Sequence, residues 1–238
     1  MALVAAAVCP HPPLLVPEVA AGAAEELDDL RAGCDVALRG LLDADPGLVF
    51  VVGDAPARLA YTGADWGDLS AYGVAVSARL GSGACAGQPI LPLSLTIGAW
   101  LVARTGWTGD RQGYGVPAGL SAAECAGIGR EVADLDDRVA LLVMGDGSAR
   151  RTVKAPGYLD DRAAAFDARV AAALGSADTE ALLGLEGPLA VELMVAGRAS
   201  WQVLAGAAEG SGWHAELLHD DAPYGVAYLV ATWLPAPV

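Results

Sequence analysis

The sequence predicts an α/β domain in three layers, with a central, largely parallel (mixed) sheet flanked by helices. A strand–helix–strand pattern occupies residues 3–53, and strand-like and helix-like segments alternate again after residue 120. Alternation of this kind is typical of parallel sheets with crossover helices. The length of 238 residues suits one domain of this class, so we expect residues 1–238 to form a single domain.

The first elements follow from apolar patterning and proline placement. Leu3–Cys9 is an unbroken run of small apolar residues that Pro10 ends, which predicts a buried strand. Pro17 suits the start of a helix, and apolar residues at three- and four-residue spacing continue a helical stripe to about Leu42. Leu48–Gly53 is again wholly apolar and predicts the second strand.

The middle of the chain is rich in glycine, and its pattern predicts only a short strand at Val74–Val76 and a helix at Leu95–Arg104. Ser121 and Glu124 then have the spacing of a capping box, which predicts a helix to about Val132. The remaining expected elements are a strand at 139–144, an amphipathic helix at 160–174, a helical region at 182–209 that Gly197 interrupts, and strands at 213–218 and 226–233.

Composition excludes several classes of protein. Hydrophobic residues make up 54% of the chain, so it can bury enough surface to fold. The net charge of −15 argues against nucleic acid and anionic membranes as partners, because both require clustered cations. The longest uncharged stretch, Leu80–Ala103, is interrupted by glycines and prolines, and no basic region precedes the first apolar run. We therefore expect a cytoplasmic protein that does not cross a membrane.

Cysteines and histidines carry no metal signature of their own. The cysteines are far apart and lack a Cys-x-x-Cys pair, which predicts buried thiols rather than zinc ligands or disulfides: Cys9, Cys34, Cys85 and Cys125. His214 and His219 are five residues apart on an expected strand. Without a bulge, that spacing places them on opposite faces, where they cannot share one metal ion.

Polar residues follow three of the expected strands. His11 comes after the first strand, Asp54 after the second, and Asp146 with Ser148 after the strand at 139–144. Ligands of open α/β sheets bind outside the carboxyl ends of the strands, so we expect these side chains to meet in one crevice. Each aspartate also has a plainer explanation, because aspartate readily accepts hydrogen bonds from free amides in turns and helix caps.

Six segments, in order along nearly the whole chain, carry a resemblance to a known family: VAAAVCPHPPLLVPEV, LVFVVGD, LLVMGDGSARR, GYLDDRAAAFDARVAAAL, MVAGRASWQVLAGAAEG and APYGVAYLVATW. They resemble the corresponding segments of the LigB-like superfamily. The superfamily contains the catalytic subunits of class III extradiol ring-cleavage dioxygenases and the Memo proteins. The resemblance rests on an opening motif, a second-strand motif, a Gly-Asp segment with the helix after it, a Gly-Arg helix and a closing strand.

The resemblance also implies a metal site that this chain retains only in part. In active members, two histidines and a carboxylate or cysteine hold a metal, ferrous iron in the dioxygenases, and a further histidine moves protons. His11 matches the first ligand, whereas the segment 53–58 contains no histidine. Alanines occupy the acid/base position, Ala149, and the approximate position of the last ligand, Ala196. Glu192 lies one helical turn before Ala196 and is the residue that could replace it.

We therefore consider three hypotheses for the function of the protein. The first is a catalytically degenerate member that binds a small molecule or partner through the old cleft, with no cofactor. The second is an active dioxygenase that holds Fe(II) in a carboxylate-rich site around His11. The third is a structural or oligomerisation protein, for which an exposed apolar patch would be the signature. The pocket candidates are Asp54, Asp146, Ser148, Glu192 and Arg198, with His11 as the one retained metal-ligand position.

The expected ligand is small and anionic or aromatic. Four arginines lie in or near the matching motifs, and the guanidinium fork suits a carboxylate: Arg58, Arg150, Arg151 and Arg198. The alternative is that these arginines neutralise nearby acids on a very acidic surface. Catalytic subunits of the superfamily associate with themselves or with a small helical subunit, so the resemblance also allows a homo-oligomer.

Overall fold

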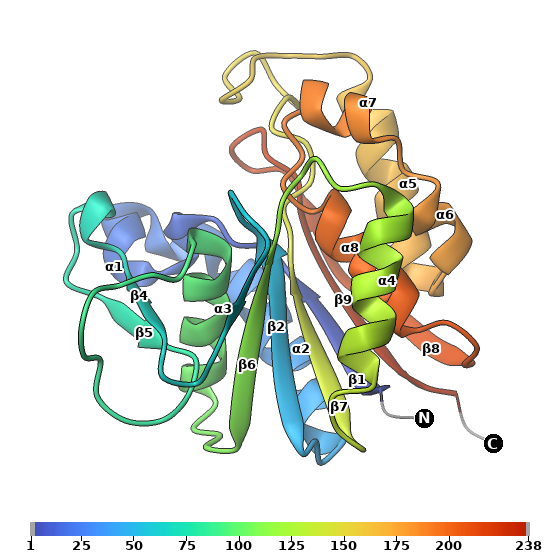
Figure 1. Ribbon diagram of the computed structural model, residues 1–238. Coiled ribbons are helices and arrows are strands. Elements are labelled where there is room, and N and C mark those ends of the chain that lie inside the picture. The colour runs from blue at the N-terminus through green and yellow to red at the C-terminus, as the bar shows by residue number, and fades with distance from the viewer. Residues whose placement is uncertain (1–2, 237–238) are drawn as a thin grey trace.

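The computed structural model describes residues 3–236, and in this range one large sheet is covered by helices on both faces (Figure 1). Its seven strands are Leu3–Cys9 (β1), Leu48–Asp54 (β2), Leu59–Tyr61 (β3), Asp110–Val116 (β6), Val139–Met144 (β7), Trp213–Asp221 (β8) and Tyr228–Pro235 (β9). They lie in the order β3-β6-β2-β7-β1-β9-β8. A separate small hairpin pairs Trp66–Asp68 (β4) with Ser77–Arg79 (β5).

The sheet has a parallel centre and antiparallel edges. Strands β6, β2, β7 and β1 pair in parallel, whereas β3 pairs antiparallel with β6, and β9 and β8 continue antiparallel from β1. Strands β1, β2 and β7 read as continuous apolar runs because both of their faces are covered by helices. The predicted α/β architecture, with a mixed central sheet between two helical layers, is confirmed.

Helices form the outer layers of the molecule. The α-helices are Pro17–Ala20 (α1), Asp28–Asp43 (α2), Leu93–Arg104 (α3), Ala122–Ala133 (α4), Ala163–Ser176 (α5), Thr179–Leu183 (α6), Gly187–Glu192 (α7) and Arg198–Ala207 (α8). Short 3₁₀ helices span Pro13–Leu15, Ala21–Leu27 and Ser70–Tyr72. Figure 1 shows α2 and α3 on one face of the sheet, with α4, α5 and α8 on the other.

Alternate residues of each central strand belong to two different cores. On the α2–α3 face, Val49 and Val51 of β2 pack with residues of those helices such as Leu38. On the opposite face, Phe50 and Val52 pack with residues such as Trp201 of α8. The apolar runs that predicted the strands therefore supply both cores at once. No helix within residues 3–236 combines the length and apolar character that a membrane crossing requires.

Several local predictions hold, and others are wrong for identifiable reasons. The capping box at the start of α4 is present, with Ser121 and Glu124 bonded reciprocally. The helical region predicted from Pro17 to Leu42 is divided into α1, a 3₁₀ segment and α2. The strand predicted at Val74–Val76 is wrong, because the chain forms β5 at Ser77–Arg79 instead, pairing with β4.

The strand β6 was not predicted at all, although it lies inside the sheet. Its sequence, DRQGYGV, has no apolar run, and its place comes from hydrogen bonding to β2 on one side and β3 on the other. The helical region predicted at 182–209 is three short helices, α6, α7 and α8. Met194 adopts a left-handed backbone conformation between the last two, which ends the helical path before Gly197.

Candidate functional site

The three predicted strand ends meet at one edge of the sheet, because β2, β7 and β1 are adjacent and parallel. The backbone N–H of His11 donates to Oδ1 of Asp146 at 2.7 Å, and Nδ1 of His11 lies 3.7 Å from the same oxygen. Both side chains are largely buried. The chain thus places an imidazole against a carboxylate at the carboxyl edge of the sheet.

Asp54 completes this polar cluster from the end of β2. Ser94 of α3 donates its hydroxyl to the backbone oxygen of Asp54 at 2.6 Å, which fixes the strand end against that helix. Burial raises the pKa of the Asp54 carboxyl; His11 opposes this shift and the neighbouring Asp146 carboxylate reinforces it. Asp54 therefore takes up a proton more readily than an ordinary aspartate and can donate a hydrogen bond when protonated.

Four buried polar atoms of residues at this edge have no hydrogen-bond partner among residues 3–236: Nδ1 of His11, Nε of Arg150, Oγ of Ser200 and Nε1 of Trp201. Ser200 lines a small cavity together with Asp54 and Ala196. Trp201 lies beside Gly145, where an added Cβ would come within 3.0 Å of its Nε1. Buried polar groups are nearly always paired, so unpartnered donors and acceptors here indicate a place for water or a polar ligand.

The cavity is small but adjoins an open groove. The cavity volume is about 10 Å³, close to the space that one water molecule needs. The groove beside it measures about 690 Å³, within the size range of small-molecule sites. Both hollows are lined by Ala118, Val191 and Arg198, so these residues separate the polar cluster from the groove. Leu120, Leu185 and Pro188 give the groove an apolar wall.

Arg198, a predicted pocket residue, lines both the cavity and the groove, and its side chain also holds neighbouring segments together by hydrogen bonds. It donates to Oε1 of Gln202 at 2.6 Å and to the backbone oxygens of Leu120 and Ala118. Gln202 in turn donates to three carbonyl oxygens of the segment after α6 and of its last turn. Arg198 therefore ties α8 to the loop that precedes α4, and most of its donors are already used.

Two predicted pocket residues lie elsewhere. Ser148 is fully buried and bonds to Asp167 of α5 through both its backbone N–H (2.8 Å) and its hydroxyl (2.6 Å), while Arg151 lies 3.3 Å from the same carboxylate. This network is structural and does not line the cavity. Glu192 is exposed in the groove and forms an ion pair with Arg162 at 2.7 Å. The structure therefore does not bring Glu192 to the cavity that Asp54 lines.

The positions matched to the family's metal site lie as follows. Ala196 lines the cavity with Asp54, and its N–H donates to the backbone oxygen of Asp146 at 3.1 Å. Ala149 is buried, and its N–H donates to the oxygen of Leu193. Among residues 3–236, no three or more side chains of His, Cys, Asp and Glu are grouped closely enough to hold a metal ion. The donors that remain do not fit ferrous iron, which normally uses two histidines and a carboxylate.

Two predictions about the remaining histidines and the cysteines are wrong. A bulge in β8 between Leu217 and His219 shifts the register, so that His214 pairs with Leu234 and His219 with Val230. The two histidines therefore lie on the same face, contrary to the prediction from strand periodicity. Three cysteines are buried as predicted, whereas Cys85 is exposed.

Sequence inspection missed Ser200, Trp201 and Ser94 as parts of this edge. Ser200 and Trp201 belong to the first turn of α8, and Ser94 to the first turn of α3. The one signal for Ser200 and Trp201 was their position just after Gly197, the interruption that the sequence already indicated. Only the packing of α8 on β7 shows that they face the strand ends.

The fold and this edge define a three-layer α/β protein with a polar cluster at the carboxyl ends of its central parallel strands. Among solved structures, the chain is similar to uncharacterized protein JW3007 from Escherichia coli K12, with a TM-score of 0.61 and 15% sequence identity. The alignment covers 97% of this chain and 99% of that one. At this identity the likeness shows a shared fold. No family model and no curated protein matches the sequence.

Proposed function

We propose that this protein is a LigB-like scaffold that binds a small aromatic or anionic molecule at the carboxyl edge of its sheet, without iron-dependent ring cleavage. The observation that carries the proposal is the unpartnered Oγ of Ser200, which lines the same small cavity as Asp54 next to an open groove of about 690 Å³. The ordered resemblance of six segments to the superfamily, read from the sequence, supports the choice of scaffold.

The donor set supports the absence of ring-cleavage chemistry. In the described part of the chain, His11 is the one imidazole at this edge, since the other two histidines lie on β8. Glu192, the substitute ligand in the active-enzyme hypothesis, is paired with Arg162 instead. Ala149 cannot move a proton, and loss of a single general acid or base typically slows a reaction by about 10²–10⁴-fold. The residues present can position and hydrogen-bond a ligand: Asp54 when protonated can donate, and Nδ1 of His11 and Oγ of Ser200 have no hydrogen-bond partner within residues 3–236.

The test loads the purified full-length chain anaerobically with Fe(II), removes free metal, and measures both iron content and ring opening of 3,4-dihydroxybenzoate. We expect substoichiometric iron and no ring opening, together with saturable binding of 3,4-dihydroxybenzoate by isothermal titration calorimetry. His11→Ala should weaken that binding, whereas the matched His214→Ala, on an exposed position of β8, should not. Stoichiometric iron with turnover would establish the active dioxygenase instead, and absence of saturable binding would refute the ligand-binding role.

A second candidate, self-association, has one observation in its favour. Four large apolar side chains are exposed on two segments that meet where Gly157 approaches Met194, near the top of Figure 1: Tyr158, Leu159, Val191 and Met194. An exposed patch of this kind is the signature expected of an interface. Light scattering after size-exclusion chromatography measures the oligomeric state. A wild-type dimer that Val191→Glu converts to a monomer would support self-association, and a monomeric wild type would refute it.

A further inference from the structure

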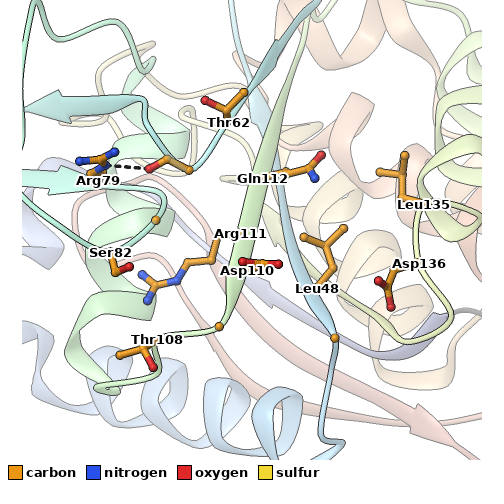
Figure 2. Close-up of a pocket in the computed structure, with 14 residues that line it drawn as sticks. Leu48, Thr62, Arg79, Ser82, Thr108, Asp110, Arg111, Gln112, Leu135 and Asp136 are labelled. Atoms are coloured by element: carbon orange, nitrogen blue, oxygen red, sulfur yellow. Dashed lines mark hydrogen bonds between the residues drawn. The ribbon is translucent and has the colours of Figure 1, made fainter.

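A separate hollow lies at the opposite, amino edge of the sheet, far from the cavity and the groove described above. Its volume is about 540 Å³, and it is open to solvent. The first residues of β2 and β6, Leu48 and Asp110, line it together with the end of β5 and the loops that follow β3, β5 and α3 (Figure 2). A hollow of this size suits a small molecule.

Two arginines line this hollow without carboxylate partners. Arg79 donates from Nε to the oxygen of Gly63 at 2.7 Å, and Arg111 donates from Nη2 to the oxygen of Trp107. Within residues 3–236, neither guanidinium lies within 4.0 Å of an acidic oxygen. Neither positive charge therefore faces a carboxylate at short range, and the guanidinium of Arg111 lies over the Trp107 ring, 5.5 Å from its centroid.

Arg111 differs from the other buried arginines. Arg31 and Arg198 are 7% and 4% exposed, and the structure gives each of them three hydrogen bonds. Arg111 is 6% exposed, yet it has one hydrogen bond, and its buried Nε has no partner among the described residues. Burial also lowers the pKa of Arg111. An arginine has five N–H donors, so Arg111 keeps donors for an acceptor in the hollow.

The other polar groups of the hollow indicate what that acceptor belongs to. Figure 2 shows the guanidinium of Arg111 extending from β6 toward the segment of Ser82, with Asp110 and then Asp136 on the other side of the view. The arginine fork matches a planar carboxylate. The two aspartates disfavour a doubly charged phosphate, but they can accept hydrogen bonds from a hydroxyl or an ammonium group.

We propose that this amino-edge pocket binds a small hydroxy- or amino-carboxylic acid. The carboxylate bonds to the guanidinium groups of Arg111 and Arg79, both of which line the hollow. The hydroxyl or ammonium group donates to Asp110 or Asp136. The site is separate from the carboxyl edge and does not depend on the function proposed there.

Isothermal titration calorimetry of the whole chain with L-serine, acetate, inorganic phosphate and ethanolamine tests the site. We expect L-serine to bind about tenfold tighter than acetate, since it adds donors for the aspartates, with phosphate weaker and ethanolamine silent. Phosphate that binds as tightly as L-serine would overturn the assignment to a carboxylic acid. Absence of saturable binding by L-serine would overturn the site itself.

Variants then locate the binding. Arg79→Gln and Arg111→Lys should each weaken L-serine binding about tenfold or more, because each removes a charged hydrogen bond. Arg79 is the variant to rely on if Arg111→Lys fails to fold. Arg138→Gln is the matched control, since Arg138 also donates to backbone oxygens, those of Ala44 and Asp45, but does not line this hollow. An equal loss in Arg138→Gln, or none in Arg79→Gln, would refute the proposal, and His11→Ala should leave binding unchanged.

Discussion

At the scale of single residues, the same side chain performs different work according to what surrounds it. Asp167 is fully buried and holds Ser148 and Arg151, whereas Asp54 stands at a cavity beside another carboxylate. Burial is the largest cause that raises the pKa of both groups, but the hydrogen bonds from Ser148 and Arg151 oppose it only at Asp167. At Asp54 the opposing influence on the pKa is the nearby His11, and the Asp146 carboxylate adds to the rise.

The raised pKa of Asp54 predicts a pH dependence of stability. The folded state binds a proton at Asp54 more tightly than the unfolded state, so stability falls as pH rises from the ordinary value of 3.8 through the raised pKa. Asp54→Asn should remove that fall, and its free energy of unfolding relative to wild type should increase across this window. Urea unfolding at several pH values measures the difference; a variant that loses stability relative to wild type as pH rises contradicts the prediction.

Glu124 provides a comparison of opposite sign. Hydrogen bonds from Ser121 lower the pKa of this capping carboxylate, so its contribution is present above the ordinary value of 4.5 and is lost as pH falls through the lowered pKa. Glu124→Gln should therefore lose stability relative to wild type at neutral pH and approach it in acid. As pH rises, the free energy of unfolding relative to wild type should therefore increase for Asp54→Asn and decrease for Glu124→Gln. Urea unfolding of both variants measures this, and trends of the same sign would contradict it.

At the scale of elements, close backbone contact decides where α8 lies. Helices α4 and α8 cross at Gly129 and Gly206, where an added Cβ on Gly129 would stand within 2.6 Å of the nitrogen of Ala207. A Cβ on Gly206 would meet the backbone of Ala126. This contact fixes α8 closely against α4, while α8 also packs on β2 and β7 and carries Ser200 and Trp201 in its first turn.

Replacement of these glycines should separate the helices. We expect Gly129→Ala to destabilise the protein by about 1–3 kcal/mol, because the backbone it would strike cannot move aside as a flexible side chain can. Gly127→Ala is the control on the same helix, where an added Cβ would meet only the end of Arg130 at 3.9 Å. There alanine should be neutral or stabilise by up to about 1 kcal/mol. Thermal denaturation of both variants gives the comparison, and equal effects would contradict it.

At the scale of the whole molecule, one sheet joins two cores. The strands β1, β2 and β7 contribute alternate residues to each core, so neither helical layer can lose its packing without exposing the other face of the same strands. Tryptophans report on both sides: Trp201 and Trp233 belong to the core under α4, α5 and α8, whereas Trp100 and Trp107 pack against the core under α2 and α3.

This arrangement predicts a single cooperative unfolding transition. Tryptophan fluorescence and far-ultraviolet circular dichroism should give coincident urea transitions with one midpoint. Phe substitution of Trp100 and Trp107 together, which leaves mainly the fluorescence of the opposite core, should leave that coincidence intact. Two separated transitions would show that the helical layers unfold independently, contrary to the prediction of one domain.

Much of the architecture was determined by the sequence alone. Unbroken apolar runs identified β1, β2 and β7, since a strand covered on both faces has to be apolar throughout. The capping pair Ser121 and Glu124 identified the start of α4, because its hydrogen bonds form within four residues. The convergence of His11, Asp54 and Asp146 followed as well, since parallel neighbouring strands end at the same edge.

Contacts between distant segments were decided only by the tertiary structure. Strand β6 is held by its neighbours rather than by its own composition, and the bulge in β8 reverses the face of His219. The sequence could not show that Ser148 turns into the core toward Asp167, or that Glu192 pairs with Arg162, because these partners are 19 and 30 residues away. Local patterns record short-range hydrogen bonding and burial, whereas the partner of a charged side chain depends on how the whole chain packs.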